Sequence, residues 1–399
     1  MKVVQINSYC GKGSTGKICV GISEASSTNG INNIIVYSHS KSNYNLSHRI
    51  TNMAYIKVQS VKSHLFGNYG FNSFFSTKKL VKFLKKYNPD IIHIHNIPGH
   101  DVNFKMLFKY ISAFNKKVVY TFHDCWAFTG YCPYFTYAGC EKWKTKCSEC
   151  PLKKKYSFLF DLSLNNYKNK KKSFSLIDLN NIVIAAPSKW MENLVKESFL
   201  KEIKTIVINN GIDLNVFKPT TSSFRRDFSL EDKYIILGVA DSWEKRKGLD
   251  VFLYLSSKLS NDFKIVLVGT NEKVDKSLPS SIISIHRTTN QVELAKLYSA
   301  ADLFVNPTRE DNFPTVNLES LACGTPVITF DTGGSPESID DTCGRVVDCD
   351  DIEGLLNNIL SIKNTRPFTR EACLKKAASF DYRDRFQQYI ELYRNLLDK

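Results

Sequence analysis

Residues 301–337 read ADLFVNPTREDNFPTVNLESLACGTPVITFDTGGSPE and decide the fold of the second half of the chain. Asp302–Asn306 is a short run with an apolar centre, as expected for a buried strand. Pro314 suits the first turn of a helix, and Gly324 ends that helix. Val327–Phe330 is the next strand. The stretch therefore predicts strand–loop–helix units in tandem, which build a parallel sheet.

The loops after these strands carry residue types that suit a nucleotide. Free backbone N–H groups at Thr315–Asn317, at the positive end of a helix dipole, could hold a diphosphate. Glu319 could accept hydrogen bonds from two vicinal hydroxyls, at about 1.5–3 kcal/mol for each bond to a charged group. Asp311 stands eight residues before it. These residues alone do not decide between two interpretations. One is a nucleotide site, and the other is an ordinary strand–helix–strand unit in which the acid is buried and caps a helix.

The stretch resembles the signature of the family 4 glycosyltransferases. That pattern is an acid, a short loop with Phe and Pro, a second acid eight residues later, then Ala-Cys-Gly-Thr-Pro and Gly-Gly-x-Pro-Glu. It is met here by Asp311, Phe313, Pro314, Glu319, Ala322–Pro326 and Gly333–Glu337. The resemblance implies an α/β protein with two Rossmann-like domains facing across a cleft, the GT-B fold. It also implies transfer of a sugar from a nucleotide-sugar with retention of configuration.

The first acid departs from the family pattern. The family usually has Glu there, whereas this chain has Asp311 in register and Glu310 just before it. Because the Asp side chain is one methylene shorter, the sequence leaves open which of the two acids contacts the donor sugar. The resemblance further implies that the N–H groups of Thr315 and Val316 bind the donor diphosphate and that Glu319 binds the ribose.

Lys247 and Arg246 are expected to contact the same diphosphate. Asp241–Gly248 resembles the phosphate-binding loop of the family, in which a Lys directly precedes a Gly, and Lys247 occupies that position. The family's Arg five or six residues earlier is absent, because Asp241 and Ser242 stand there. Arg246 is the expected substitute, since a guanidinium suits a bidentate phosphate contact. A solvated basic turn remains the alternative.

A glycine-rich loop, Gly11–Lys17, follows the first expected strand, Lys2–Asn7. It fits the start of a P-loop, but Ile18 stands where a P-loop needs Ser or Thr to bind Mg²⁺. In the resembled family such a loop approaches the donor phosphates and the acceptor, so Gly13 and Gly16 are candidates for donor binding. A P-loop phosphotransferase and a tight strand–helix turn remain alternatives.

Histidines follow two further expected strands of the first half. His93 and His95 alternate along one strand and therefore share a face. His95 and Asn96 lie at the carboxyl end of that strand, where side chains reach the ligand crevice of a parallel sheet. The family places a His after the next strand near the reacting sugar, and His123 matches it, with Asp124 beside it. The candidates for contacts with the acceptor are His95, Asn96 and Asp124. The alternative is that His95 and His123 are buried core residues whose hydrogen bonds are all made within the protein.

Five cysteines fall within residues 125–150. The last four have the spacing C-x7-C-x6-C-x2-C, which could form a structural zinc site, although only one close pair is present. A subset of the resembled family carries a similar insert after Trp-Ala-Phe-Thr-Gly, met here by Trp126–Gly130. This indicates a subgroup and establishes no metal. Zinc, free thiols and a redox role stay open for Cys125, Cys132, Cys140, Cys147 and Cys150.

Composition favours a cytoplasmic protein with an anionic partner. The 399 residues suffice for two or three domains. Eleven cysteines without a secretory signal favour a reduced compartment, and no apolar stretch approaches the ~20 residues that span a bilayer. Residues 1–180 carry a net charge of +18, and the remainder carries −3. This favours a membrane surface over nucleic acid, for which no motif is visible, with a general solubility effect as the alternative.

Several other segments have less specific patterns. A strand is expected around Ala54–Val58. Residues 62–86 mix aromatics with lysines, as in an interfacial patch or in a solvated face over a buried stripe. Lys153–Lys155 and Lys170–Lys172 are expected in an exposed segment. A loop-like composition at residues 218–233 places the domain boundary nearby.

These expectations define two domains. Residues 1–214, with the cysteine-rich insert 125–150, form an acceptor-side domain, onto which a helix at residues 383–399 returns. Residues 215–382 form the domain that binds the nucleotide-sugar.

The predicted activity is that of a metal-independent glycosyltransferase, peripheral at the inner face of the cell membrane. It transfers a sugar to a lipid-linked glycan in surface polysaccharide biosynthesis and requires no cofactor. Lys247, Asp311 and His123 are expected to act by positioning and charge stabilisation. A non-catalytic nucleotide-binding protein is the rival. The motifs do not specify the sugar, the base or the linkage.

Overall fold

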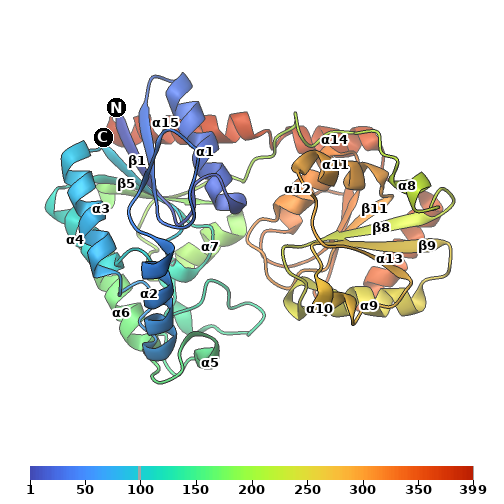
Figure 1. Cartoon of the computed structure of the whole chain (residues 1–399), viewed down its shortest axis with the longest axis horizontal. Coiled ribbons are helices and arrows are strands. Elements are labelled where there is room, and N and C mark those ends of the chain that lie inside the picture. The colour runs from blue at the N-terminus through green and yellow to red at the C-terminus, as the bar shows by residue number, and fades with distance from the viewer. Residues whose placement is uncertain (98–99, 399) are drawn as a thin grey trace. The chain divides into compact units, whose positions relative to one another are not determined.

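The structure, a computed structural model, describes residues 1–97 and 100–398 (Figure 1). It divides into two compact units. Unit 1 comprises Met1–Asn209 and Arg383–Lys399, and unit 2 comprises Asn210–Tyr382. The predicted boundary after residue 214 lies a few residues beyond this division, and the C-terminal helix belongs to unit 1.

Unit 1 is built on a seven-stranded parallel sheet in the order β3-β2-β1-β4-β5-β6-β7. Its central strands are buried and mostly apolar, as expected for parallel strands covered by helices on both faces, although they include the polar residues Gln5 and His93. The strands are β1 (Lys2–Ile6), β2 (Asn32–Tyr37), β3 (Ser47–Arg49), β4 (Ile91–Ile94), β5 (Lys117–Thr121), β6 (Ile182–Ala186) and β7 (Thr205–Val207).

Helices connect these strands, and the last one returns from the far end of the chain. α15 packs on α1 at Gly21, where the Phe386 ring occupies the space a side chain would need. The helices of unit 1 are α1 (Gly13–Thr28), α2 (Met53–Phe66), α3 (Phe74–Tyr87), α4 (Phe104–Ala113), α5 (Lys153–Tyr156), α6 (Ser163–Phe174), α7 (Lys189–Glu197) and α15 (Tyr382–Leu397), with short 3-10 turns η1 (Trp126–Phe128), η2 (Lys142–Lys144) and η3 (Leu179–Asn181).

The strand expected around Ala54–Val58 is wrong, because these residues lie in α2. Asn52 caps the helix by accepting a hydrogen bond from the Tyr55 N–H at 2.9 Å. Gly67 ends it with a left-handed φ of 74°. A five-residue apolar window does not separate a strand from one turn and a half of helix, whereas the caps at both ends do.

Lys170 also differs from expectation, because it is fully buried. It lies on α6, and its ammonium donates to the carbonyls of Trp126 at 2.6 Å and Thr129 at 2.9 Å. Burial lowers the pKa of Lys170 to about 7. The lysine therefore ties α6 to the start of the cysteine-rich insert instead of contributing to an exposed segment.

Unit 2 has a six-stranded parallel sheet in the order β10-β9-β8-β11-β12-β13. Its strands are β8 (Tyr234–Val239), β9 (Phe263–Val268), β10 (Ile282–Ile285), β11 (Leu303–Asn306), β12 (Val327–Phe330) and β13 (Gly344–Val347). Its helices are α8 (Phe224–Asp227), α9 (Leu249–Lys258), α10 (Glu272–Asp275), α11 (Gln291–Ala300), α12 (Thr315–Ala322), α13 (Ile352–Thr365) and α14 (Arg370–Ala378), with 3-10 turns η4 (Lys245–Lys247) and η5 (Pro336–Ser338).

Both sheets confirm the predicted α/β class and reverse their strand order at one point. The order reverses between β1 and β4 in unit 1 and between β8 and β11 in unit 2. Open α/β sheets bind ligands outside the carboxyl ends of the strands at such points. The candidate residues follow these four strands and β5. Within the described residues, no helix is long and apolar enough to cross a membrane.

Candidate active site

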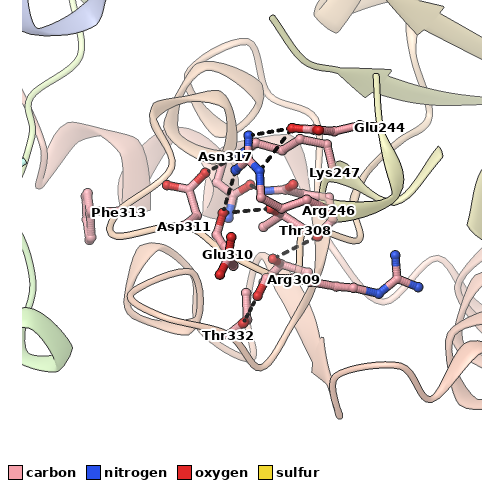
Figure 2. A network of polar contacts seen from close by, with 12 residues as sticks. Glu244, Arg246, Lys247, Thr308, Arg309, Glu310, Asp311, Phe313, Asn317 and Thr332 are labelled. Carbon is pink, nitrogen blue, oxygen red and sulfur yellow. Dashed lines mark hydrogen bonds and ion pairs between the residues drawn. The ribbon is translucent and has the colours of Figure 1, made fainter. Parts of the chain in front are cut away.

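The loops after β8 and β11 meet at the switch point of unit 2 (Figure 2). The Lys247 Nζ lies 2.7 Å from the Asp311 Oδ2. Lys247 ends η4, and Asp311 lies in the loop between β11 and α12. Two of the predicted catalytic residues are therefore brought together, a cation and a carboxylate that share one surface of unit 2.

Arg246 lies beside this pair and is held by Glu244. Its Nε and Nη2 both contact the Glu244 Oε1 at 3.1 Å, and its Nη1 donates to the Glu310 carbonyl at 3.5 Å. Its side chain is 22% exposed. The predicted substitute for the family's arginine thus lies next to Lys247 in sequence and is anchored to the acid loop.

The two acids of that loop have different environments. Glu310 is buried, and its carbonyl accepts from the Thr308 hydroxyl at 3.1 Å. Asp311 is partly exposed and faces Lys247. Of the two acids that the sequence left open, Asp311 is the one paired with the cation.

The sequence did not predict a role for Arg309, although its ion pairs hold the loop between β11 and α12 in place. Its guanidinium is 4% exposed and bridges Asp250 at 2.8 and 3.0 Å and Asp350 at 2.6 Å. The two acids lie 59 and 41 residues away in sequence. No local spacing signals such a bridge, so sequence reasoning had no means of finding it.

The Gly-Gly turn after β12 packs against Asp311. Gly333 has a φ of 56°, and a Cβ there would lie 1.7 Å from the Asp311 carbonyl oxygen. The Gly334 N–H donates to the same oxygen at 3.3 Å. A side chain at residue 333 would push this turn off the acid loop, which explains why the motif requires glycine.

The start of α12 presents its N–H groups at the same edge. Among the described residues, no side chain caps this helix, whose first residues are Thr315 and Val316. Glu319, one turn further on, accepts a hydrogen bond from the Tyr298 hydroxyl at 3.0 Å. Tyr298 is fully buried on α11, and burial raises its pKa, so the hydroxyl remains a donor. Sequence reasoning missed Tyr298 because it resembles an ordinary core residue.

In unit 1, the predicted acceptor-side residues line one small cavity of about 10 Å³. Its walls include His95, Asn96, His123 and Asp124, which follow β4 and β5. The His95 Nδ1 lies 3.1 Å from the His123 Nε2. The rings of His93 and His95 are 3.9 Å apart, so the predicted shared face is confirmed.

Burial controls the charge of these groups. It lowers the pKa of His123 to about 4 and that of His95 well below its ordinary value. Burial raises the pKa of Asp124 to about 6, although its carboxylate accepts the Trp126 N–H at 2.8 Å. At neutral pH both imidazoles are therefore neutral and Asp124 is mostly ionised.

The glycine-rich loop joins the same group of residues through Asn7, which sequence reasoning missed. The Asn7 Oδ1 accepts the Asn96 N–H at 3.2 Å, and its Nδ2 contacts the Thr15 hydroxyl at 3.4 Å. Gly13 has a φ of 66° at the start of α1, and a Cβ on Gly16 would lie 3.2 Å from the backbone of the loop. Gly13 and Gly16 thus lie on unit 1, whereas the other donor-binding candidates lie on unit 2.

The cysteine-rich insert encloses a cavity of about 20 Å³ lined by Cys132, Cys140, Cys147 and Cys150. A hydrogen bond between Cys132 and Cys150 raises the pKa of Cys132 and lowers that of Cys150. The Gly130 N–H donates to the Cys147 sulfur at 3.2 Å.

Zinc binding by these cysteines stays a prediction. Within residues 1–97 and 100–398, no group of three or more His, Cys, Asp or Glu side chains is arranged to hold a metal ion. Metal analysis of protein purified under reducing conditions separates the alternatives. One zinc per chain supports a structural site, and none supports free thiols.

Two family models match the chain. The one described as Glycosyltransferase Family 4 spans residues 29–216, and the one described as Glycosyl transferases group 1 spans residues 233–364.

Curated relatives are also glycosyltransferases. The chain is 22% identical to the putative colanic acid biosynthesis glycosyl transferase WcaC of Escherichia coli K12, over 99% of this chain and 100% of that protein. It is 25% identical to the N,N'-diacetylbacillosaminyl-diphospho-undecaprenol alpha-1,3-N-acetylgalactosaminyltransferase of Campylobacter jejuni, over 52% of this chain and 57% of that protein.

Solved structures share the fold. Sucrose-phosphate synthase of Thermosynechococcus elongatus has a TM-score of 0.73 at 18% identity, covering 100% of this chain and 99% of that one. Anabaena HepE, in complex with UDP, has a TM-score of 0.70 at 15% identity, covering 99% and 100%. At these identities the likeness shows the GT-B fold alone. Because the two family regions together take in most of its length, the chain belongs to the family 4 glycosyltransferases.

Proposed function

We propose that the protein is a retaining, metal-independent glycosyltransferase that moves a sugar from a nucleotide-sugar to a lipid-linked glycan in surface polysaccharide biosynthesis. The observation that carries the proposal is the Lys247–Asp311 pair at the carboxyl edge of the second sheet. A cation for a diphosphate and a carboxylate for sugar hydroxyls lie there side by side, close in sequence to the start of α12.

The donor would bind to unit 2 through these groups. Lys247 and Arg246 would contact the diphosphate together with the N–H groups of Thr315 and Val316. Glu319, oriented by the Tyr298 hydroxyl, would accept from the ribose hydroxyls. These positive groups would neutralise the leaving diphosphate, the role that a divalent cation has in other transferases.

The reaction would break the bond between the anomeric carbon and the diphosphate oxygen and form a bond to an acceptor oxygen on the same face. The acceptor's proton would pass to the leaving diphosphate. Asp311 would hold the sugar hydroxyls, and the neutral His123 of unit 1 would stabilise the positive charge that develops on the sugar ring. The names of two relatives, a colanic acid transferase and an undecaprenol-linked glycan transferase, support the polysaccharide and the lipid-linked acceptor.

A surface of unit 1 combines exposed apolar side chains with neighbouring lysines. It supports peripheral binding to the inner face of the cell membrane, where a lipid-linked acceptor would lie. The N–H groups of Phe158 and Leu159 donate to the carbonyls of His64 and Leu65 at 2.7 and 3.0 Å, so this segment lies against the end of α2. We name the exposed side chains here the α2 patch: Val61, Leu65, Phe66, Phe158, Leu159 and Phe160. Exposed lysines adjoin the patch in sequence at Lys57, Lys62, Lys154 and Lys155.

A thermal-shift screen tests the donor site. The purified protein is heated with UDP-, GDP-, ADP- and CMP-sugars, each with and without EDTA. We expect one nucleotide-sugar to raise the melting temperature, equally with EDTA, and Glu319→Ala to abolish the rise. UDP-sugars come first, because the structural relative HepE was solved with UDP.

Other outcomes identify the rivals. A shift seen only with ATP and Mg²⁺, and lost in Lys17→Ala, would favour a phosphotransferase that uses Gly11–Lys17. A shift with a nucleotide-sugar that is never followed by transfer or by slow donor hydrolysis would favour a non-catalytic nucleotide-binding protein.

A further inference from the structure

A chain of hydrogen bonds links the backbone of α1 to His123 through buried polar side chains. The Gln5 Nε2 donates to the Cys19 carbonyl at 2.8 Å. The Gln5 Oε1 lies 2.9 Å from the His95 Nε2. The His95 Nδ1 lies 3.1 Å from the His123 Nε2. Gln5 is fully buried in β1, and His95 is 2% exposed, so bulk water does not compete for the bonds that Gln5 makes to Cys19 and His95.

The first link has only one possible orientation. The Cys19 carbonyl is a backbone acceptor and cannot donate, so the amide nitrogen of Gln5 must face it. The same nitrogen donates to the Asn33 Oδ1 at 3.0 Å. The carbonyl oxygen of Gln5 therefore faces His95, and this assignment does not rest on a choice between two equivalent amide flips.

The protons on the two histidines follow from this link. An amide oxygen only accepts, so the His95 Nε2 must carry a hydrogen. A neutral imidazole has one donor and one acceptor, which makes the His95 Nδ1 an acceptor. The His123 Nε2 must then carry the hydrogen that His95 accepts, and the His123 Nδ1 is left unprotonated. Burial keeps both rings neutral at pH 7.

We propose that Gln5 is a positioning residue that sets the tautomer of His123 through His95, so that His123 meets the substrate as a neutral imidazole with an unprotonated Nδ1. A neutral ring with this lone pair suits a developing positive charge on a sugar, whereas an imidazolium would repel it. His123 and His95 both line the small cavity of unit 1. The use of this tautomer in catalysis rests on the proposed transfer reaction, but the tautomer itself does not.

The C-terminal helix supports the stack from the other side. His93 packs on His95, and its Nδ1 lies 2.6 Å from the Tyr393 hydroxyl of α15, while its Nε2 lies 2.8 Å from the Thr121 hydroxyl. The Thr121 hydroxyl donates to the Tyr389 hydroxyl at 3.2 Å, so it accepts from the His93 Nε2, and the His93 Nδ1 accepts from the Tyr393 hydroxyl. His93 packs against the ring of His95 and so fixes the ring positions, whereas the tautomer of His95 follows from its hydrogen bond to Gln5.

Long-range ¹H–¹⁵N spectra of protein labelled with ¹⁵N-histidine test the proposal without any substrate. Signals are assigned from His95→Asn and His123→Asn variants. At pH 7 we expect both His95 and His123 to carry hydrogen on Nε2 alone. A hydrogen on the His123 Nδ1 in the unaltered protein would overturn the proposal.

Gln5→Met keeps the side-chain length and removes both the donor and the acceptor. We expect His95 and His123 to become mixtures of tautomers in this variant, with signals of the other histidines unchanged. Gln59→Met, a buried glutamine on α2, is the matched control. Unchanged His123 tautomers in a folded Gln5→Met protein would also overturn the proposal. If Gln5→Met does not fold, the spectrum of the unaltered protein still decides.

A kinetic measurement extends the test to catalysis. With an active donor and acceptor pair, we expect Gln5→Met to lower kcat at least fivefold while the donor KM stays within twofold. Failure to find any transferase activity would contradict the proposed function. The spectra would still decide whether Gln5 sets the tautomer of His123. A normal kcat beside mixed tautomers would remove the positioning role.

Discussion

Lys247 and Asp311, 64 residues apart in sequence, form an ion pair with the Lys Nζ 2.7 Å from the Asp Oδ2. Their side chains remain 22% and 23% exposed, so a ligand can reach both. The pair joins the loop after β8 to the loop after β11 (Figure 2). A diphosphate that binds Lys247 must compete with Asp311 for the ammonium group.

Lys247→Ala should lower turnover at least tenfold, or about 1.4 kcal/mol of barrier, because the ammonium would stabilise the leaving diphosphate. Initial rates of sugar transfer provide the measurement. Lys245→Ala, two residues earlier with an exposed side chain, is the matched control and should leave the rate within twofold. Equal losses of rate in both variants would mean that transfer depends on the total positive charge of the loop and not on the position of Lys247.

Asp311→Asn should separate phosphate binding from transfer. Without the carboxylate, Lys247 is released to the phosphate, so we expect the free nucleoside diphosphate to bind more tightly by calorimetry. Transfer should nevertheless fall, because the hydrogen bonds to the sugar are weakened. Weaker binding of the nucleoside diphosphate would show that Asp311 orients Lys247 instead of competing for it.

Tyr298→Phe should weaken donor binding several-fold, because Glu319 loses the hydroxyl that orients its carboxylate. Glu319→Ala should weaken it further. Titration with the nucleotide-sugar that gives the largest thermal shift measures both affinities. Tyr234→Phe, another largely buried tyrosine of unit 2, is the control and should bind the donor normally. A normal affinity in Tyr298→Phe would show that Glu319 is held by other contacts.

Phe158→Ser with Phe160→Ser should reduce binding to anionic vesicles, because both rings belong to the exposed α2 patch. We expect at least a fivefold loss in co-sedimentation with vesicles that contain phosphatidylglycerol, and weaker binding to all vesicles at high salt. Phe228→Ser, an exposed phenylalanine of unit 2, is the control. Equal binding by the double variant and the unaltered protein would rule out this surface.

The histidines of unit 1 whose pKa is lowered by partial or full burial should make the protein less stable as the pH falls. Their folded pKa is lowered from 6.5, to about 4 for His123 and His100. Between these values the unfolded chain binds more protons, so the free energy of unfolding falls as the pH is lowered from about 6.5 towards 4. The raised pKa of Asp124, about 6, acts in the opposite direction with a smaller shift.

Denaturant unfolding of the protein between pH 7 and 5 measures this effect. The slope of stability against pH should be shallower in His123→Asn, because one titrating group is removed. For a buried group, each unit of pKa depression is worth about 1.4 kcal/mol. An identical slope in the variant would mean that the surroundings of His123 do not lower its pKa.

Much of the site could be predicted from local patterns. Glycines, prolines and apolar runs mark where strands end and helices begin, and parallel strands bring their carboxyl ends to one edge. Asp311, Lys247 and His123 were predicted because they match motifs of the resembled family at these strand ends. Arg309, Tyr298 and Gln5 were not, because each acts through a partner distant in sequence and resembles an ordinary loop or core residue in its own neighbourhood.

The sequence by itself determined the two parallel sheets and the family of the enzyme. The sheets follow from periodicity and turn chemistry, which are local, and the family follows from its match to the motif between Asp311 and Glu337, which also lies in one stretch of the chain. Only the tertiary structure decided which acid faces Lys247, that Lys170 is buried, and that Gln5 lies against His95. These depend on burial and on hydrogen-bond partners brought together by folding, which no spacing along the chain encodes.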